Sequence, residues 1–320
     1  MNTITINGNE IDANALISLL TGQQHQAPLM KDYAMNWFET FKKAKLRPRT
    51  QLGYQSNLTK HIIPFFGDMR VNEIKVSDVQ AWYNTMSDLA KSTARQPSVI
   101  LHQIFEAAKE DHLITENPTE SDRLTLPSKA TEREALTMVE IKDVIRQLPR
   151  LRPSDYLMMS LMIYTGERRG EVLGLRWEDV DFENNLISVE RSVYFLSNQP
   201  YIGPTKSKAG ERKIPLLPEL KEALMKFRKD TGYIVGDGDK PLSERGYRYA
   251  FERISKKMEL HGATAHVFRH TFLTMAVDSL DLKTLQTIAG HASHVTTMKY
   301  IHKRDEKIRE AGTKLQGMYA

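Results

Sequence analysis

The sequence predicts a mainly α-helical protein with a small antiparallel β-sheet, an α+β fold built as two domains. The chain has 320 residues, about twice the length of a common single domain. Apolar residues recur with helical spacing over most of the chain, and the pattern changes to strand-like alternation mainly between residues 187 and 216. A short polar segment containing Pro127 separates the two helical regions.

Residues 1–27 form an N-terminal extension. The stretch ITINGNEID alternates around Asn7 and Gly8, which predicts a short β-hairpin, and a weakly apolar helix is expected after it. The extension ends in the polar run GQQHQ. Its composition assigns it no role.

Residues 28–125 predict a compact helical domain. Apolar spacing indicates helices in AMNWFETFKKAK, YQSNLTKHIIPFF, SDVQAWYNTMSDLA and TARQPSVILHQIFEAAKED, the third with Ser77 as its N-cap. We expect the aromatic side chains to lie in the core or along a groove rather than to stack on bases. They are Trp37, Phe38, Phe41, Trp82 and Tyr83.

A linker is expected over residues 126–136, and a second domain over residues 137–320. Thr137 and Glu140 have the spacing of a capping box and predict the start of a helix. A second helix is expected over SDYLMMSLMIYTGERRGEVLGL, with its methionines in the core. ISVERSVYF and ERKIPL predict strands, and the chain then returns to helix after Pro218, ending in a charged tail with a helix over 305–311.

The charge distribution suggests a polyanionic partner. The net charge is +5 and the isoelectric point is about 9.1. Basic residues gather in two separate places, which suits a protein that wraps its ligand, although two solvated faces would give the same pattern. One group holds Lys31, Lys42, Lys43, Lys45, Arg47, Arg49 and Lys60, and the other holds Lys206, Lys208, Arg212 and Lys213.

Several classes of protein are disfavoured. The sequence has no cysteine, which excludes disulfides, thiolate metal sites and cysteine nucleophiles. The longest apolar run, residues 156–164, is about half of what a bilayer span needs, and the N-terminus lacks the pattern of a signal peptide. We therefore expect no membrane association and a cytoplasmic location.

Five short motifs in the second half of the chain carry the chemistry. They are TGERRGE (165–171), TKSKAGERKIPL (205–216), HVFRH (266–270), AGH (289–291) and TTMKYIH (296–302). Each motif alone has a bland structural explanation. Their joint order and spacing, across residues 137–302, resemble the signature of the tyrosine recombinase (phage integrase) family, and the preceding helical domain resembles that family's core-binding domain.

The resemblance implies a catalytic set and a clamp-shaped, two-domain arrangement around DNA. It maps catalytic roles onto Arg168, Lys206, His266, Arg269, His291 and Tyr300, with Glu171 in support. It also implies double-stranded DNA attachment sites as substrate and a homo-tetramer on DNA, and it leaves open an accessory DNA-bending or directionality protein. The DNA-binding residues expected outside the catalytic set are Lys42, Lys43, Lys45, Arg47, Arg49, Lys208 and Arg212.

The chemistry of phosphodiester cleavage explains why such residues are needed. Arg168 and Arg269 would hold the phosphate oxygens bidentately as negative charge grows, and His291 would donate a further hydrogen bond. Tyrosine has an ordinary pKa near 10, so Tyr300 as nucleophile needs a base or a positive pocket.

The expected site also includes residues that transfer protons and a residue that holds other side chains in place. His266 is placed to handle the tyrosine proton or to contact the phosphate. Lys206 is the candidate general acid for the leaving 5′ oxygen, with Lys208 as its rival. Glu171 is expected to hold an arginine or histidine in place. A 3′-phosphotyrosyl intermediate stores the bond energy, so no nucleotide cofactor is expected, and the histidines lack the HExxH spacing of a zinc helix, so no metal is expected either.

One residue departs from the family pattern. Glu167 occupies a position where a hydrophobic residue commonly precedes the first arginine, and we expect its side chain to face Arg169 or solvent. The leading interpretation is the integrase of a phage or another mobile element, acting through a Holliday junction. This interpretation implies a nucleoid-associated location, or the host cytoplasm if a phage encodes the chain. A chromosome-dimer resolving recombinase, a type IB topoisomerase and a DNA-binding regulator with an inactive site are the alternatives.

Overall fold

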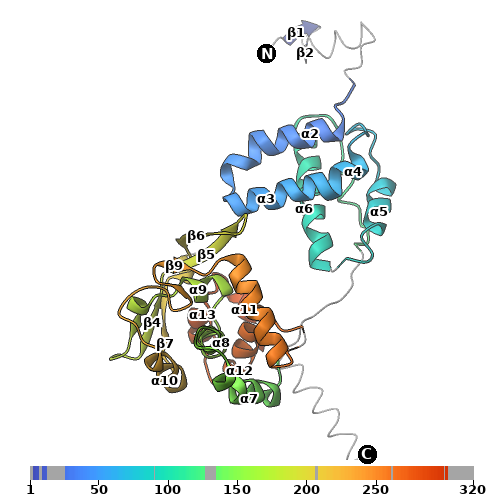
Figure 1. Ribbon diagram of the computed structural model, residues 1–320. Coiled ribbons are helices and arrows are strands. Elements are labelled where there is room, and N and C mark those ends of the chain that lie inside the picture. The colour runs from blue at the N-terminus through green and yellow to red at the C-terminus, as the bar shows by residue number, and fades with distance from the viewer. Residues whose placement is uncertain are drawn as a thin grey trace, which may run out of the picture. The chain divides into compact units, whose positions relative to one another are not determined.

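The computed structural model describes residues 3–6, 9–12, 26–89, 91–126, 135–205, 208–260, 262–298 and 300–301. The chain divides into two compact units, Met1–Glu132 and Arg133–Ala320, and each is described by itself (Figure 1). Strands β1 (Thr3–Ile6) and β2 (Asn9–Asp12) pair antiparallel with Ile6 opposite Asn9, which confirms the predicted hairpin. The helix expected after this hairpin, and the helix expected over 305–311, lie outside the described residues.

The first unit is helical, as predicted. Two of the expected helices are interrupted by turns of π-helix or 3-10 helix. Each of them therefore consists of consecutive pieces. In chain order the elements are α2 (Met30–Trp37), the π-helical turn η1 (Phe38–Lys42), the 3-10 turn η2 (Lys43–Lys45), α3 (Pro48–Asn57), the π-helical turn η3 (Leu58–Ile62), α4 (Ile63–Phe66), α5 (Val76–Asn84) and α6 (Lys91–Glu110).

Aromatic residues fill the core of this unit. Phe38, Phe66 and Trp82 are fully buried, and the Trp82 indole donates a hydrogen bond to the His61 carbonyl oxygen at 2.9 Å. Phe41 differs from the prediction, because 52% of it is exposed.

The expected cap of α5 is also wrong. The helix begins at Val76, before Ser77, because the Asp78 carboxylate accepts a hydrogen bond from the Lys75 backbone N–H at 2.8 Å.

The second unit combines helices with small antiparallel sheets, which confirms the predicted fold class. Its strands form the sheets β3-β4-β7, β5-β6 and β8-β9. The helical elements are α7 (Met138–Gln147), η4 (Leu148–Arg150), α8 (Pro153–Thr165), α9 (Arg169–Gly174), η5 (Trp177–Asp179), η6 (Lys208–Gly210), α10 (Pro218–Lys226), α11 (Glu244–Lys257), α12 (Ala265–Ala276) and α13 (Leu282–Ala289). The strands are β3 (Val180–Asp181), β4 (Leu186–Val189), β5 (Arg191–Leu196), β6 (Gln199–Pro204), β7 (Arg212–Pro215), β8 (Gly236–Asp237) and β9 (Lys240–Pro241).

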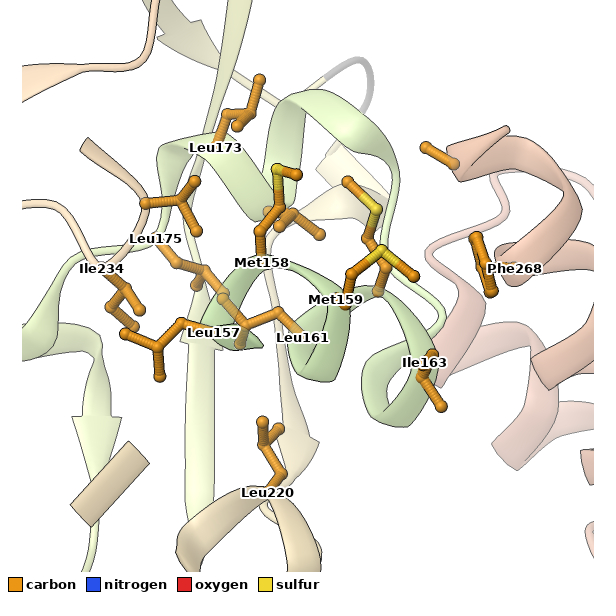
Figure 2. Packing of buried hydrophobic residues seen from close by; sticks show 14 of the residues in the cluster. Leu157, Met158, Met159, Leu161, Ile163, Leu173, Leu175, Leu220, Ile234 and Phe268 are labelled. Atoms are coloured by element: carbon orange, nitrogen blue, oxygen red, sulfur yellow. The ribbon is translucent and has the colours of Figure 1, made fainter. Parts of the chain in front are cut away.

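Helix α8 is the centre of the second core. Met158, Met159 and Leu161 are almost fully buried, as predicted for the methionine-rich run, and α10, α11 and α12 pack around the helix. Figure 2 shows these side chains packed between Leu173 of α9 and Phe268 of α12. None of the helices in the described ranges combines the length and apolarity that a membrane span requires.

The chain departs from the predicted elements in two places that shape the site. The helix expected over residues 154–175 breaks at Gly166 into α8 and α9. The strand expected over ISVERSVYF divides at Glu190 into β4 and β5, which belong to different sheets. The pattern also missed β6, which pairs with β5 through a two-residue turn at Ser197 and Asn198, both with positive φ.

Candidate active site

Four of the predicted catalytic residues come together in the second unit. Arg168 is the N-cap of α9, Arg269 lies in α12, His291 follows α13, and Tyr300 packs against the small cluster formed by α12 and α13. The segments are far apart in the sequence, so the fold itself brings them together.

Two glycines allow this close approach. Gly166 ends α8 with φ +61, and a Cβ there would overlap the Phe272 ring. Gly290 ends α13 with φ +60, and a Cβ there would lie 2.9 Å from Nη1 of Arg212. Both positions need the left-handed conformation that favours glycine, and the two backbone carbonyls accept hydrogen bonds from Arg269 and Arg168.

Arg168 is held at its terminal nitrogens and stays partly open. Its Nη1 donates to Glu171 Oε1 at 2.7 Å, and its Nη2 donates to the Gly290 carbonyl oxygen at 2.8 Å. About a third of the side chain, 32%, is exposed. A fork fixed in this way can meet phosphate oxygens without first losing rotational freedom.

Arg269 lies deeper. Its Nη1 donates to the Gly166 carbonyl oxygen at 2.9 Å, and its Nη2 donates to the Ala289 carbonyl oxygen at 2.6 Å. Burial, together with the charge of Arg168, lowers the pKa of Arg269 to about 10. The guanidinium group therefore remains a cation at neutral pH, although it lies in a poorly solvated place.

His291 differs from the expectation that it donates to phosphate. Its Nε2 lies 2.9 Å from Nη2 of Arg269, and its Nδ1 lies 2.9 Å from Oγ1 of Thr297. Burial and the charges of Arg269 and Arg168 lower the pKa of His291 to about 4, so the ring is neutral at neutral pH. Because arginine can only donate, Nε2 acts as an acceptor in this arrangement.

Tyr300 lies near two histidine rings. Its ring centroid is 5.0 Å from that of His270 and 6.3 Å from that of His291. Burial raises the pKa of Tyr300, and the charges of Arg269 and Arg168 act in the opposite direction. The phenol is therefore protonated at neutral pH in the DNA-free protein.

His270 is not in the catalytic set that the motifs predict. The second histidine of HVFRH follows Arg269 directly, and that position in the motif was the available signal. Its Nδ1 lies 3.1 Å from Thr274 Oγ1, which holds the ring beside Tyr300.

Glu171 and Arg212 form a buried pair beneath the arginines. Arg212 Nη2 donates to Glu171 Oε2 at 3.1 Å, its Nε donates to the Ile288 carbonyl oxygen, and its Nη1 donates to the Gly210 carbonyl oxygen. Glu171 thus holds Arg168, as expected. The prediction of a DNA contact for Arg212 is corrected, because only 3% of its side chain is exposed and internal acceptors occupy it.

Glu167 also differs from the prediction. It faces neither solvent nor Arg169, since it is only 1% exposed, and Arg169 lies over the rings of Phe195 and Tyr247. Its carboxyl group points into the same buried cluster as Glu171 and Arg212.

The structure says less about the remaining predicted catalytic residues, His266 and Lys206. His266 is exposed in the first turn of α12. Lys206 lies outside the described residues, as does the side chain of Lys208, so the structure does not distinguish between these two candidates for the general acid.

The basic residues expected to bind DNA in the first unit surround the turn between α2 and α3. Lys43 pairs with Glu39, and Lys42 lies over the Trp37 ring. Arg49 lines a groove of about 740 Å³ between α3 and α6. Arg95, which sequence analysis did not single out, lines the same groove. Lys45 and Arg47 are exposed beside it in the chain.

Within the described residues, one group of side chains has the composition of a metal site. His102, Glu106 and Glu120 of the first unit place ligand atoms within 4.8 Å of one another. Asn117 already donates to Glu106 at 2.7 Å, and Lys109 pairs with Glu120. The group shares no residue with the predicted catalytic set.

Comparisons with known proteins agree with this geometry. The model of the phage integrase family matches residues 134–307, and that of the N-terminal SAM-like domain of phage integrases matches residues 29–87. A putative prophage phiRv2 integrase of Mycobacterium tuberculosis is 24% identical over 319 residues, covering 96% of this chain and 83% of that protein. The transposase of transposon Tn916 from Enterococcus faecalis is 26% identical over 284 residues, covering 80% of this chain and 70% of that protein.

A solved structure shows the same fold. The Tn1549 transposon integrase, in complex with a circular intermediate DNA, superimposes with a TM-score of 0.76 at 23% identity, covering 87% of this chain and 98% of that one. The family model alone spans more than half of the chain and includes all the residues of the site described above. The chain belongs to the phage integrase family of tyrosine recombinases.

Proposed function

We propose that the protein is a site-specific DNA recombinase, the integrase of a phage or another mobile element, that cuts and rejoins DNA through Tyr300. The observation that carries this proposal is the convergence of Arg168, Arg269 and His291 beside the Tyr300 ring. Its relatives support it, since they are named as a prophage integrase and a transposase.

The proposed step is a transfer of one phosphodiester bond. The Tyr300 oxygen attacks the phosphorus, a 3′-phosphotyrosyl bond forms, and the bond to the 5′ oxygen breaks. The leaving oxygen takes a proton, for which Lys206 is the candidate donor. Attack by a 5′ hydroxyl from a partner strand reverses the reaction and joins the new strands, through a Holliday junction, without any external energy source.

The electrostatics of the site suit this step. Arg168 and Arg269 are preorganised by backbone carbonyl oxygens, so little reorganisation is needed as negative charge grows on the phosphate. Nη2 of Arg168 keeps one hydrogen beyond the one given to Gly290, and the group is partly exposed.

The Tyr300 proton needs an acceptor. His266 was predicted for this role, and His270 is a second candidate because its ring is next to that of Tyr300. The base takes this proton in the DNA complex. There, bound DNA changes the burial of Tyr300.

We propose that residues 28–125 form a core-type DNA-binding domain, residues 126–136 a linker, and residues 137–320 the catalytic domain, closing on DNA as a clamp. The groove lined by Arg49 and Arg95 is the proposed phosphate-contacting surface of the first domain. A homo-tetramer on DNA, an accessory protein and action in the cytoplasm belong to the same proposal. Residues 1–27 receive no role.

Recombination between two DNA molecules tests this function. Two plasmids would carry the junction sequences found at the ends of the element that encodes the chain. Exchange that depends on Tyr300 and on both sites supports a recombinase. Relaxation of supercoils without exchange would indicate a topoisomerase, and sequence-specific binding without any cleavage would indicate an inactive regulator.

A further inference from the structure

Glu167 is a buried acid at the centre of the proposed site. It lies between Gly166, whose carbonyl oxygen accepts from Arg269, and Arg168, the N-cap of α9. The residue is 1% exposed, and its Oε1 has no hydrogen-bond partner among the described residues. A buried carboxylate without donors is costly, so its protonation state requires an explanation.

The hydrogen bonds of Thr165 show how little support the Glu167 carboxyl group receives. The Thr165 hydroxyl has one proton, and it donates that proton to the Leu161 carbonyl oxygen at 2.6 Å. Oε2 of Glu167 lies 3.4 Å from the same hydroxyl oxygen. The Glu167 backbone N–H also donates to this oxygen at 3.2 Å, and 3.4 Å is long for a hydrogen bond between two oxygens. Among the described residues an ionised Glu167 carboxylate would therefore receive at most one weak hydrogen bond, which favours the neutral acid.

The surrounding charges agree. Groups that face Glu167 come from each neighbouring element: Thr165 of α8, Glu171 of α9, Arg212 of β7 and Arg269 of α12. Burial, and then the negative charge of Glu171, raise the pKa of Glu167 to about 8, while Arg212, the Thr165 hydroxyl and Arg269 oppose this shift. Glu171 already compensates Arg212, so the two arginines do not hold Glu167 in its ionised form.

We propose that Glu167 is a positioning residue whose carboxyl group must be neutral for the arginine pocket to hold the scissile phosphate. This inference rests on the proposed function of that pocket. With Glu167 neutral, Arg168, Arg212 and Arg269 outweigh Glu171 by two positive charges. Loss of the proton halves that excess at the position where the phosphate gains negative charge.

Ionised Glu167 would also compete for Arg269. The Arg269 guanidinium now donates to the Gly166 and Ala289 carbonyl oxygens, which fix its direction. A charge-assisted hydrogen bond to a carboxylate is stronger than one to a carbonyl, so the ionised acid would draw the guanidinium away from its position. Proton loss from Glu167 therefore switches the site off through Arg269.

The test is the pH dependence of covalent adduct formation on a nicked DNA that carries the element's junction sequence. Wild type and Glu167→Gln are compared, each normalised to its own rate at neutral pH. At about pH 9 we expect the normalised rate of Glu167→Gln to exceed that of wild type by about tenfold. The reason is that only about a tenth of the wild-type molecules then keep the proton on Glu167. Glu183→Gln, a change in an exposed turn, is the matched control and should follow wild type.

The outcomes separate this inference from the proposed function. A ratio that stays within about twofold at every pH overturns the role of Glu167. An adduct formed by Tyr300→Phe would instead overturn the proposed function. Glu167→Met, neutral and of similar length, should share the alkaline profile of Glu167→Gln.

If neither variant folds, infrared spectra of wild type on either side of pH 8 provide the test. We expect one protonated-carboxyl C=O band to disappear at the higher pH. An unchanged carboxyl region overturns the proposal.

Discussion

Glu167 and Glu171 are both buried, yet folding moves their proton affinities in opposite directions. Burial raises the pKa of both groups, but Arg212 and Arg168 pair directly with Glu171 and lower its pKa overall. Among the described residues, Glu167 has no arginine or lysine in an ion pair with it. One acid thus serves as a fixed anion that orients two arginines, while the other is a neutral neighbour.

Replacing Glu167 by glutamine should change how stability depends on pH. A carboxyl group whose pKa rises from 4.5 to about 8 takes up a proton on folding between those values. The free energy of unfolding of wild type then falls with pH in that window, at up to about 1.4 kcal/mol per pH unit. Glu167→Gln lacks this loss, so its stability relative to wild type should increase from pH 4.5 to about 8 and level off above.

Chemical denaturation at several pH values measures this difference. Glu183→Gln is the control, since its exposed side chain gives no reason for a pH-dependent difference. A stability difference between wild type and Glu167→Gln that does not vary with pH would show that Glu167 is ionised in the folded protein.

The sequence was informative about which residues meet and less so about how they bond. The motifs selected Arg168, Arg269, His291 and Tyr300 because each chemical role needs a particular side chain. They placed Arg212 on the DNA because a basic residue in a basic cluster is usually exposed. Its burial depends on Glu171, Gly210 and Ile288, which only the fold brings to it.

At the scale of elements, the end of α13 is the most constrained feature. Gly290 has φ +60, its carbonyl oxygen accepts from Arg168, and His291 follows it. In Gly290→Ala the new Cβ would meet the Arg212 guanidinium, which three internal acceptors hold in place. We expect a loss of at least about 1 kcal/mol in the free energy of unfolding and a loss of DNA cleavage.

Gly238→Ala is a matched control for this change. Gly238 has φ +55, but a Cβ there has nothing within 4 Å. The Gly238→Ala protein has the same kind of backbone strain but no collision of the new Cβ. We therefore expect it to be destabilised less and to cleave DNA still. Equal effects of the two substitutions on cleavage would contradict a specific role for the Gly290 turn.

Element boundaries were harder to predict than element types. Periodicity identified ISVERSVYF as strand, but alternation does not show that β4 and β5 join different sheets at Glu190. The β6 sequence QPYIGP is rich in proline and glycine and was not recognised as a strand. Its pairing comes from the Ser197–Asn198 turn, where the Asn198 side chain also accepts from the Arg245 backbone N–H at 2.8 Å.

The whole molecule carries a positive charge, and DNA binding should depend strongly on salt. Each phosphate contact contributes roughly one unit to the slope of log affinity against log salt concentration. Replacing both Arg49 and Arg95 by alanine should therefore lower that slope by about two and weaken binding to any DNA sequence. Filter binding or fluorescence anisotropy over a range of salt concentrations measures it.

Lys109→Ala is the control for this prediction. Lys109 is on α6 with Arg95, but about 21 Å further along the helix, and it pairs with Glu120. Its replacement should leave the slope unchanged. A slope that falls equally in both proteins would assign the salt dependence to overall charge rather than to the groove.

Length and the charge pattern predicted two domains and a polyanionic ligand, and the motifs predicted the reaction. They did not predict the sequence that the protein recognises, because base contacts depend on which side chains reach the grooves of DNA. The proposed reaction depends on Tyr300.

Covalent trapping tests that claim most directly. Wild type and Tyr300→Phe would be incubated with the nicked junction DNA in the presence of EDTA and then denatured in SDS. We expect an SDS-resistant adduct at the 3′ phosphate with wild type and none with Tyr300→Phe. An adduct that survives the loss of Tyr300, or salt-sensitive binding of wild type to the same DNA without any adduct, would contradict it.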